Sequence, residues 1–221
     1  MALKMLRLFD LILSVFLLLL LSPLLVFVCL WNYCTGEHEI FFKQIRMGKN
    51  GEEFEILKFA TMVKNSENIG GGGFTEINDP RLLVLGSFLR KTKIDELPQL
   101  LNVLRGEMSL VGFRPIVKQS FVRAMEIGNK EIYSVLPGMT GPASIILRNE
   151  DEIIEGVEDK KKYYDDHVLP VKVSLDDWWA RNRNVYNYFV VLLLTALSLV
   201  TPPDILPLNL LKNLPKSRFP V

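Results

Sequence analysis

Cysteine and histidine are scarce in this chain of 221 residues, which contains two of each. Cys29 and Cys34 both lie in or beside an apolar stretch, so no disulfide framework is expected, and this suits a domain in the reducing cytosol. His38 and His167 are too far apart in the sequence to form a zinc-ligand motif. The sequence therefore predicts neither a disulfide-stapled secreted domain nor a zinc protein.

Further absences narrow the class of protein. The formal net charge is only +1, which gives no global reason to expect nucleic acid as a partner. No Gly-Lys-Ser/Thr follows the glycines at Gly70–Gly73, so this segment is predicted to be a flexible active-site loop and not a nucleotide P-loop. No internal repeat is evident, and the length suits one domain with a membrane appendage. A hydrophobic fraction of 49% and a mean hydropathy of +0.21 indicate membrane contact.

The longest apolar stretch is Leu11–Leu30, and its twenty uncharged residues have the length that usually spans a bilayer as a helix. Ser22-Pro23 interrupts it in the middle, where the proline removes a backbone hydrogen bond. Basic residues flank it on both sides, so the positive-inside rule favours placing neither flank outside; they are Lys4, Arg7, Lys43, Arg46, Lys49 and Lys58. We therefore expect residues 1–35 to form a re-entrant helix-break-helix anchor, in preference to a full span.

Other residues near the two ends of the chain bear on membrane contact. Trp31 and Tyr33 are expected to mark the return of the anchor through the interface, and Asp10 is expected to reach headgroup level beside Arg7. Residues 181–221 are expected to form a C-terminal apolar segment that is membrane-associated or packed. Its apolar part has twelve residues, too few to span unaided, so an interfacial element, a buried core helix and a partner-binding helix all stay open.

Residues 36–180 are predicted to form a globular domain with an α/β fold, rich in helix and with a small irregular sheet. Two strands, Phe41–Arg46 and Phe54–Phe59, flank the turn Gly48–Gly51 and predict a hairpin. The other predicted elements are a helix at Ile116–Ile127, a turn at Pro137–Gly141, a short strand at Ala143–Leu147 and a solvated helix face within Glu150–Asp166.

Residues 90–115 carry most of the candidate chemistry. Leucines at positions 97, 100, 101 and 104 recur with helical spacing, which predicts an amphipathic helix with Pro98 in its first turn and Gly106 as its cap. Asp95 and Glu96 would then lie at the helix N-terminus, where helix capping alone would explain two carboxylates. Nearby basic side chains favour instead a polyanionic substrate and a divalent metal ion; they are Arg90, Lys93 and Arg114.

The central stretch resembles the signature of the bacterial sugar transferases, which are monotopic phosphoglycosyl transferases. The resemblance lies in the run DPRLLVLGSFLRKTKIDELPQLLNVLRGEMSLVGFRP at residues 79–115. Two further runs agree with it, FFKQIRMGKNGEEFEILKFATM at residues 41–62 and PGMTGPASIILRN at residues 137–149, as does the apolar segment broken at Ser22-Pro23. With gaps, the similarity extends from about residue 7 to about residue 178.

This resemblance implies transfer of a sugar 1-phosphate, usually from a UDP-sugar, to a polyprenyl (undecaprenyl) phosphate as the first membrane step of glycan assembly. The location it implies is the bacterial inner membrane, with the catalytic domain on the cytoplasmic face. Asp95 would attack the donor's β-phosphorus and form an aspartyl phosphosugar, while Glu96 would bind Mg²⁺ or Mn²⁺. Phosphate contacts are expected from Lys58, Arg90 and Arg114, and nucleotide-sugar contacts from Arg148 and Asn149. No nucleic-acid partner is expected, and a homodimer stays open.

Three positions depart from the family pattern. Ala60 replaces an arginine, Phe113 replaces a proline, and His167 takes the place of a late tyrosine. Activity is nevertheless favoured because the main chemical groups are all present, namely Lys58, Asp95, Glu96 and Arg114. Two other functions stay open: a catalytically inactive membrane scaffold in a glycan-assembly complex, and a Mg²⁺-dependent phosphohydrolase with water as the acceptor. The sequence predicts neither the sugar nor the pathway.

Overall fold

The computed structural model describes residues 2–66, 79–128, 130–154, 156–202 and 205–215. The loop at Gly70–Gly73 lies outside these residues. Within the described parts helices outweigh strands, which confirms an α-rich α/β fold. The strands form two separate two-stranded sheets and not one irregular sheet.

The first sheet is the hairpin that the sequence predicts. β1 (Phe41–Met47) pairs antiparallel with β2 (Glu53–Phe59). In the turn between them Asn50 and Gly51 have φ angles of 56° and 76°. These left-handed conformations are tolerated by asparagine and glycine, so an Asn-Gly pair suits a tight hairpin connection.

The second sheet joins distant parts of the chain, because β3 (Ser109–Val111) pairs in parallel with β4 (Gly138–Thr140). The chain then enters α6 (Pro142–Ile146), so the strand predicted at Ala143–Leu147 is wrong. The β-branched pair Ile145-Ile146 favoured a strand. However, Pro142 presets φ at the start of a helix, and a 2.9 Å hydrogen bond from Leu147 N–H to the Ala143 carbonyl closes the last turn.

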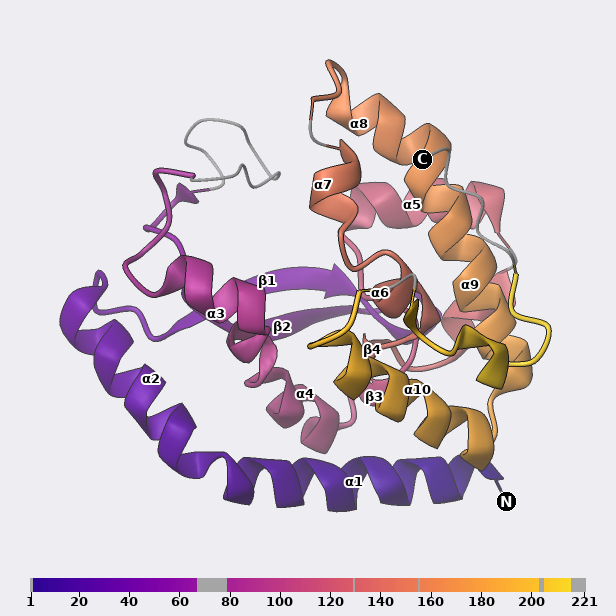
Figure 1. The fold of residues 1–221 in the computed structure, drawn as a ribbon, viewed down its shortest axis with the longest axis horizontal. Coiled ribbons are helices and arrows are strands. Elements are labelled where there is room, and N and C mark those ends of the chain that lie inside the picture. Colours follow the sequence, from indigo (N-terminus) through magenta and orange to yellow (C-terminus); the bar gives the residue numbers. More distant parts are fainter. Residues whose placement is uncertain (1, 67–78, 129, 155, 203–204, 216–221) are drawn as a thin grey trace.

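Most of the remaining helices are short and lie around these sheets (Figure 1). Of those predicted, Ile116–Ile127 is confirmed as α5, which starts two residues later because Val117 is still extended. The bounds of these remaining helices are α3 Gly86–Thr92, η3 Ile94–Glu96, α4 Gln99–Arg105, α5 Lys118–Ile127, η4 Lys130–Ser134, α7 Glu150–Ile154, α8 Lys160–Tyr163, the π-helix η5 Tyr164–Val168, α9 Leu169–Asn182, α10 Val185–Ser198 and η7 Leu208–Leu210. The short helix η1 (Lys49–Gly51) forms the hairpin turn.

The N-terminal apolar stretch forms two helices, α1 (Ala2–Leu20) and α2 (Ser22–Thr35), which meet at the predicted break. The bend between them is 64°, and Ser22 Oγ donates a 2.8 Å hydrogen bond to the Leu19 carbonyl beside it. Figure 1 shows α1 along one edge of the molecule, and α2 bends away from the direction of α1 along the adjoining side. No single described helix is long and apolar enough to cross a membrane, but this bent pair is, by length and composition.

Two charged side chains attach α1 to the rest of the molecule. Asp10 is 2% exposed, and its Oδ1 accepts hydrogen bonds from Leu110 N–H at 2.9 Å, Ser109 Oγ at 3.0 Å and Tyr188 Oη at 2.8 Å. Asp10 therefore faces the protein interior, where three donors compensate its burial, and its place at headgroup level stays a prediction. Arg7 donates to the carbonyl of Val103 at 2.8 Å, which also accepts from Gly106 N–H at 3.0 Å, and so binds the C-terminal end of α4.

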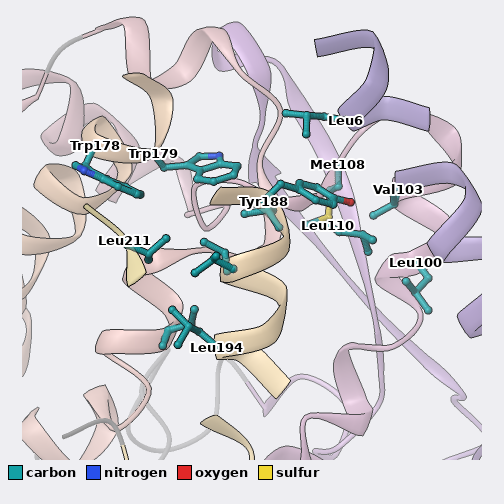
Figure 2. Close-up of a cluster of buried hydrophobic side chains, with 14 of the residues drawn as sticks. Leu6, Leu100, Val103, Met108, Leu110, Trp178, Trp179, Tyr188, Leu194 and Leu211 are labelled. Atoms are coloured by element: carbon teal, nitrogen blue, oxygen red, sulfur yellow. The ribbon is translucent and has the colours of Figure 1, made fainter. Parts of the chain in front are cut away.

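The main hydrophobic core lies where α1, α4, β3, α9 and α10 meet (Figure 2). α10 contributes three residues that are completely buried, Tyr188, Val191 and Leu194. Its other face stays open to the surroundings, since Phe189 is 42% and Leu193 is 52% exposed. The C-terminal apolar segment thus has a packed face and an exposed apolar face on one helix.

Candidate active site

A sharp turn places the acidic pair between two short helices. α3 ends at Lys93, whose φ of 60° is left-handed and redirects the chain into η3 (Ile94–Glu96). α4 begins only at Gln99, so Asp95 and Glu96 lie in a 3₁₀ turn just before it. Gly106 ends α4 with a φ of 87°, as its predicted role as a cap requires.

Glu96 is bound by two cations from different parts of the fold. Lys58 Nζ, on β2, and Arg114 Nη2, just after β3, each lie 2.9 Å from Glu96 Oε1. Burial by itself favours the neutral acid, but Arg114 and then Lys58 outweigh it and hold the pKa of Glu96 well below its usual range. Glu96 is therefore a fixed, ionised carboxylate.

Asp95 has a different environment although it is the adjacent residue. Its side chain is 6% exposed, and Oδ1 has no hydrogen-bond partner among the described residues. Burial raises the pKa of Asp95, the charge of Lys58 opposes this, and the like charge of Glu96 adds to it. The site therefore holds one carboxylate that is bound on two sides and one that has an unpaired oxygen.

The two cations differ in how strongly the site favours their charged forms. Burial lowers the pKa of Lys58, and the charge of Glu96 only partly offsets this effect. The pKa of Arg114 is raised, chiefly by Glu96. A planar guanidinium can bind a phosphate through two hydrogen bonds, whereas the lysine acts as a point charge.

The other predicted site residues lie at different distances from this pair. Arg90 is half-buried and its Nη1 lies 3.7 Å from Met62 Sδ; it forms an ion pair with neither carboxylate, but its charge acts to lower the pKa of Asp95. Arg148 lines the same cavity as Glu96 and Arg114, whereas Asn149 is exposed and does not. The structure thus brings together Lys58, Asp95, Glu96, Arg114 and Arg148.

A cavity of about 410 Å³ opens beside Glu96. Four of its charged lining residues form one connected group, because Arg114 is paired with Glu96 and interacts with Glu150, which is paired with Lys172. Lys93 and Arg148 also line the cavity. The apolar lining residues are Leu17 on α1, Ile94 in η3, Leu97 and Leu100 around the start of α4, Leu110 on β3, Met139 on β4, Ala143, Ile145 and Leu147 in and after α6, and Leu192 and Leu199 in and after α10.

Lys172 is a site residue that the sequence did not indicate. It is 7% exposed, forms an ion pair with Glu150 and lies 4.9 Å from the ring centroid of Tyr164. Glu150 and Tyr164 belong to the segment interpreted as a solvated helix face, and for these two residues that interpretation is wrong. Lys172 stands in no motif, and the π-helix that precedes α9 leaves no pattern in the sequence.

Most of the chain is similar to known proteins. The family model described as bacterial sugar transferase matches residues 1–202. The chain is 35% identical over 207 residues to an undecaprenyl-phosphate galactose phosphotransferase of Salmonella typhimurium, covering 86% of this chain and 39% of that protein. It is 35% identical over 170 residues to a UDP-glucose:undecaprenyl-phosphate glucose-1-phosphate transferase of Escherichia coli, covering 76% of this chain and 36% of that one.

A shorter relative matches over most of both sequences. An uncharacterized sugar transferase of Bacillus subtilis, EpsL, is 35% identical over 190 residues, which is 86% of this chain and 84% of that protein. By contrast, the chain spans only 39% of the length of the Salmonella protein. The match of the family model to residues 1–202 and these relatives show that the chain belongs to the bacterial sugar transferase family.

Proposed function

We propose that this chain transfers a sugar 1-phosphate from a UDP-sugar to a membrane polyprenyl phosphate, with Asp95 as the covalent nucleophile. The observation that carries the proposal is the asymmetry of the acidic pair. Glu96 Oε1 accepts from both Lys58 and Arg114, whereas Asp95 Oδ1 has no partner among the described residues. An oxygen that already binds two cations is a weaker nucleophile than an unpaired one, so the geometry favours Asp95.

The reaction divides into two displacements, as covalent catalysis usually does. In the first, a carboxylate oxygen of Asp95 forms a bond to the β-phosphorus of the donor, the bond to the bridging oxygen breaks, and UMP leaves. In the second, a phosphate oxygen of the polyprenyl phosphate attacks the same phosphorus, and the carboxylate of Asp95 leaves. The product is a polyprenyl diphosphosugar, and the enzyme returns to its starting state.

Positive side chains around the acidic pair would bind the phosphate oxygens. Lys58 and Arg114 are fixed on either side of Glu96, so they need little rearrangement when a diphosphate arrives. Arg148 lines the cavity, and no ion pair engages it within the described part of the chain. We assign Arg148, and Asn149 beside it, to the nucleotide sugar, and Arg90 to the outer edge of the phosphate site.

The proposal includes Mg²⁺ or Mn²⁺, held through Glu96. No group of three or more histidine, cysteine, aspartate or glutamate side chains that could hold a metal ion occurs among the described residues. A Mg²⁺ ion shared with substrate phosphates needs only one or two protein carboxylates, and Glu96 would supply one of them. When bound, the ion would offset the charge of the diphosphate as the carboxylate approaches.

The acceptor explains the bent apolar pair. A polyprenyl phosphate presents its charged group at headgroup depth, so the enzyme must hold its site there. We propose that α1 and α2 form a re-entrant anchor over residues 1–35, which places residues 36–180 on the cytoplasmic face of the bacterial inner membrane. The 64° bend at the Ser22-Pro23 break supports this topology.

A catalytically inactive scaffold is the less favoured function. The site buries two adjacent carboxylates, one of them with an unpaired oxygen, and such an arrangement costs folding free energy. A scaffold gains nothing from such an arrangement, whereas an enzyme with a carboxylate nucleophile needs it. The same site would also serve a phosphohydrolase that uses water as the acceptor. Transfer to the lipid must therefore be measured directly.

The first test concerns the nucleophile. Incubation with the correct donor from a panel of UDP-sugars, without acceptor, should leave a phosphosugar adduct that is visible by intact mass and is lost on hydroxylamine treatment. Asp95→Asn should abolish both the adduct and UMP release, because the amide is no nucleophilic anion. Adding polyprenyl phosphate to the isolated adduct should yield lipid-linked product. An adduct on Glu96, or turnover by Asp95→Asn, would contradict the assignment.

The second test compares the effects of the two carboxylates on stability. The raised pKa of Asp95 means that its ionisation destabilises the fold above the ordinary aspartate pKa, so Asp95→Asn should stabilise the metal-free protein at neutral pH by about 1 kcal/mol. The depressed pKa of Glu96 gives the opposite sign, because its contribution is present at neutral pH and lost only as pH falls through the folded pKa. Glu96→Gln should therefore destabilise by about 3 kcal/mol.

Thermal unfolding at neutral and acidic pH measures both effects. The matched control is Asp166→Asn, because Asp166 is exposed and a surface change should stay within about 0.5 kcal/mol. If both site variants changed the stability at neutral pH in the same direction, the two carboxylates would not be held as described.

The third test removes the metal. Excess chelator should abolish UMP release, and added Mg²⁺ or Mn²⁺ should restore it, because the diphosphate charge is otherwise unscreened. Glu96→Gln should need more metal for half-maximal activity. Full activity in excess chelator would exclude the metal from the reaction.

The fourth test concerns topology. In a variant with Cys29 and Cys34 changed to serine, a cysteine introduced at Lys4 should react with an impermeant maleimide only after the cells are opened. Replacing Ser22 and Pro23 with alanine removes the break, so a larger share of molecules should span the membrane and become labelled from outside. Labelling of intact cells without these replacements would show a full span.

A further inference from the structure

One face of α10 and the turn after it line the cavity beside Glu96. The residues concerned are Leu192, Thr195, Ser198 and Leu199, which recur at intervals of three, three and one and so lie on one side of the helix. Leu17 of α1 lines the same cavity. Neither helix contributes a charged group to it, and the charged lining residues all come from other elements.

The hydroxyl groups on this wall are already bound within the protein. Thr195 Oγ1 lies 2.8 Å from Thr140 Oγ1 and donates to the Val191 carbonyl, also at 2.8 Å. Ser198 Oγ donates to the Thr195 carbonyl at 2.8 Å. The wall therefore offers a ligand methyl and methylene groups and no spare donor, which suits a hydrocarbon and not a sugar or a nucleotide.

The α10 side of the cavity also continues into exposed apolar surface. Leu199 lines the cavity and is still 49% exposed, and the next residue, Val200, is 83% exposed. On α1, Leu19 is 71% and Leu20 is 60% exposed, two and three residues past Leu17. On the α10 side, the apolar wall of the cavity therefore reaches exposed apolar surface at Leu199.

We propose that α1 and α10 form the walls that hold the isoprene units nearest the phosphate of the acceptor, with that phosphate beside Arg114 and Lys172. This inference rests on the proposed function. A volume of about 410 Å³ lies in the range of about 300–1,000 Å³ that holds small ligands, so the start of a polyprenyl chain fits and the rest stays in the bilayer. α10 then has a role in choosing the acceptor in addition to its role in the core.

The test uses the same substitution on two adjacent residues of α10. Leu192→Trp adds bulk inside the cavity, whereas Leu193→Trp adds it on the exposed face, where Leu193 is 52% exposed and does not line the cavity. Adduct formation with the UDP-sugar donor alone is measured first. Turnover is then measured with undecaprenyl phosphate and with farnesyl phosphate in detergent.

Leu192→Trp should form the adduct at the rate of the unmodified protein and raise the acceptor KM about tenfold for both lipids, the effect of about two methylene groups that no longer leave water. Leu193→Trp should change neither step. Equal acceptor KM values for the two variants would overturn the inference, since the chain would then be bound by the bilayer alone. Loss of the adduct in Leu192→Trp with an unchanged unfolding temperature would also overturn it and assign the cavity to the donor.

A second pair of variants covers the case in which Leu192→Trp does not fold. Leu199→Glu places a charge at the exposed end of the cavity, and Val200→Glu places the same charge one residue further on, outside it. Only the first should raise the acceptor KM. Absence of an adduct in the unmodified protein with every donor would contradict the proposed function itself, an outcome that these acceptor measurements keep separate.

Discussion

The binding of one glutamate oxygen by two cations organises this site. Glu96 Oε1 joins three segments that are distant in sequence: β2 through Lys58, the 3₁₀ turn before α4, and the residues after β3 through Arg114. A buried carboxylate alone would be protonated or would disfavour folding, so the two cations are what allow an ionised group at this position. Because they are committed to Glu96, its neighbour Asp95 is left buried with an unpaired oxygen. The reactivity proposed for Asp95 is thus a consequence of how Glu96 is satisfied.

A second buried carboxylate relates this site to the apolar N-terminus. Asp10 on α1 accepts from the backbone of β3 and from Tyr188 on α10, and Arg7 binds the last carbonyls of α4. Two residues separate the acidic pair from α4, and two separate β3 from Arg114. The segments that carry the site are therefore the ones to which α1 is attached by directional hydrogen bonds. If α1 is embedded in a bilayer, the depth of the site is set by these contacts and not by a flexible linker.

The sequence predicted the parts of this structure that depend on local rules and missed those that depend on distant contacts. The hairpin around Asn50-Gly51 and the cap at Gly106 follow from backbone preferences, and the break at Ser22-Pro23 follows from the missing donor of proline. The position of Asp10 could not be predicted, because its three donors come from residues about 100 and 178 positions away. The strand assigned to α6 failed for a similar reason: two β-branched residues outweighed Pro142 in the local pattern. Lys172 and the parallel pairing of β3 with β4 left no local signal at all.

Phe113 and Ala60, the two positions near the site where the chain differs from the family pattern, have different surroundings. Phe113, where the family pattern has proline, is 1% exposed, packs edge-on against Tyr133 with centroids 5.0 Å apart, and accepts a 2.8 Å hydrogen bond from Gly138 N–H. Packing and the backbone bond thus hold the chain before Arg114 in the way that a proline ring would by covalent restraint. Ala60 is 6% exposed, and its carbonyl accepts a 2.9 Å bond from Asn32 of α2. It lies one residue past the end of β2 and two residues after Lys58. The replacement therefore leaves the ion pairs of Glu96 with Lys58 and Arg114 intact, so the acidic pair is assembled without an arginine at this position.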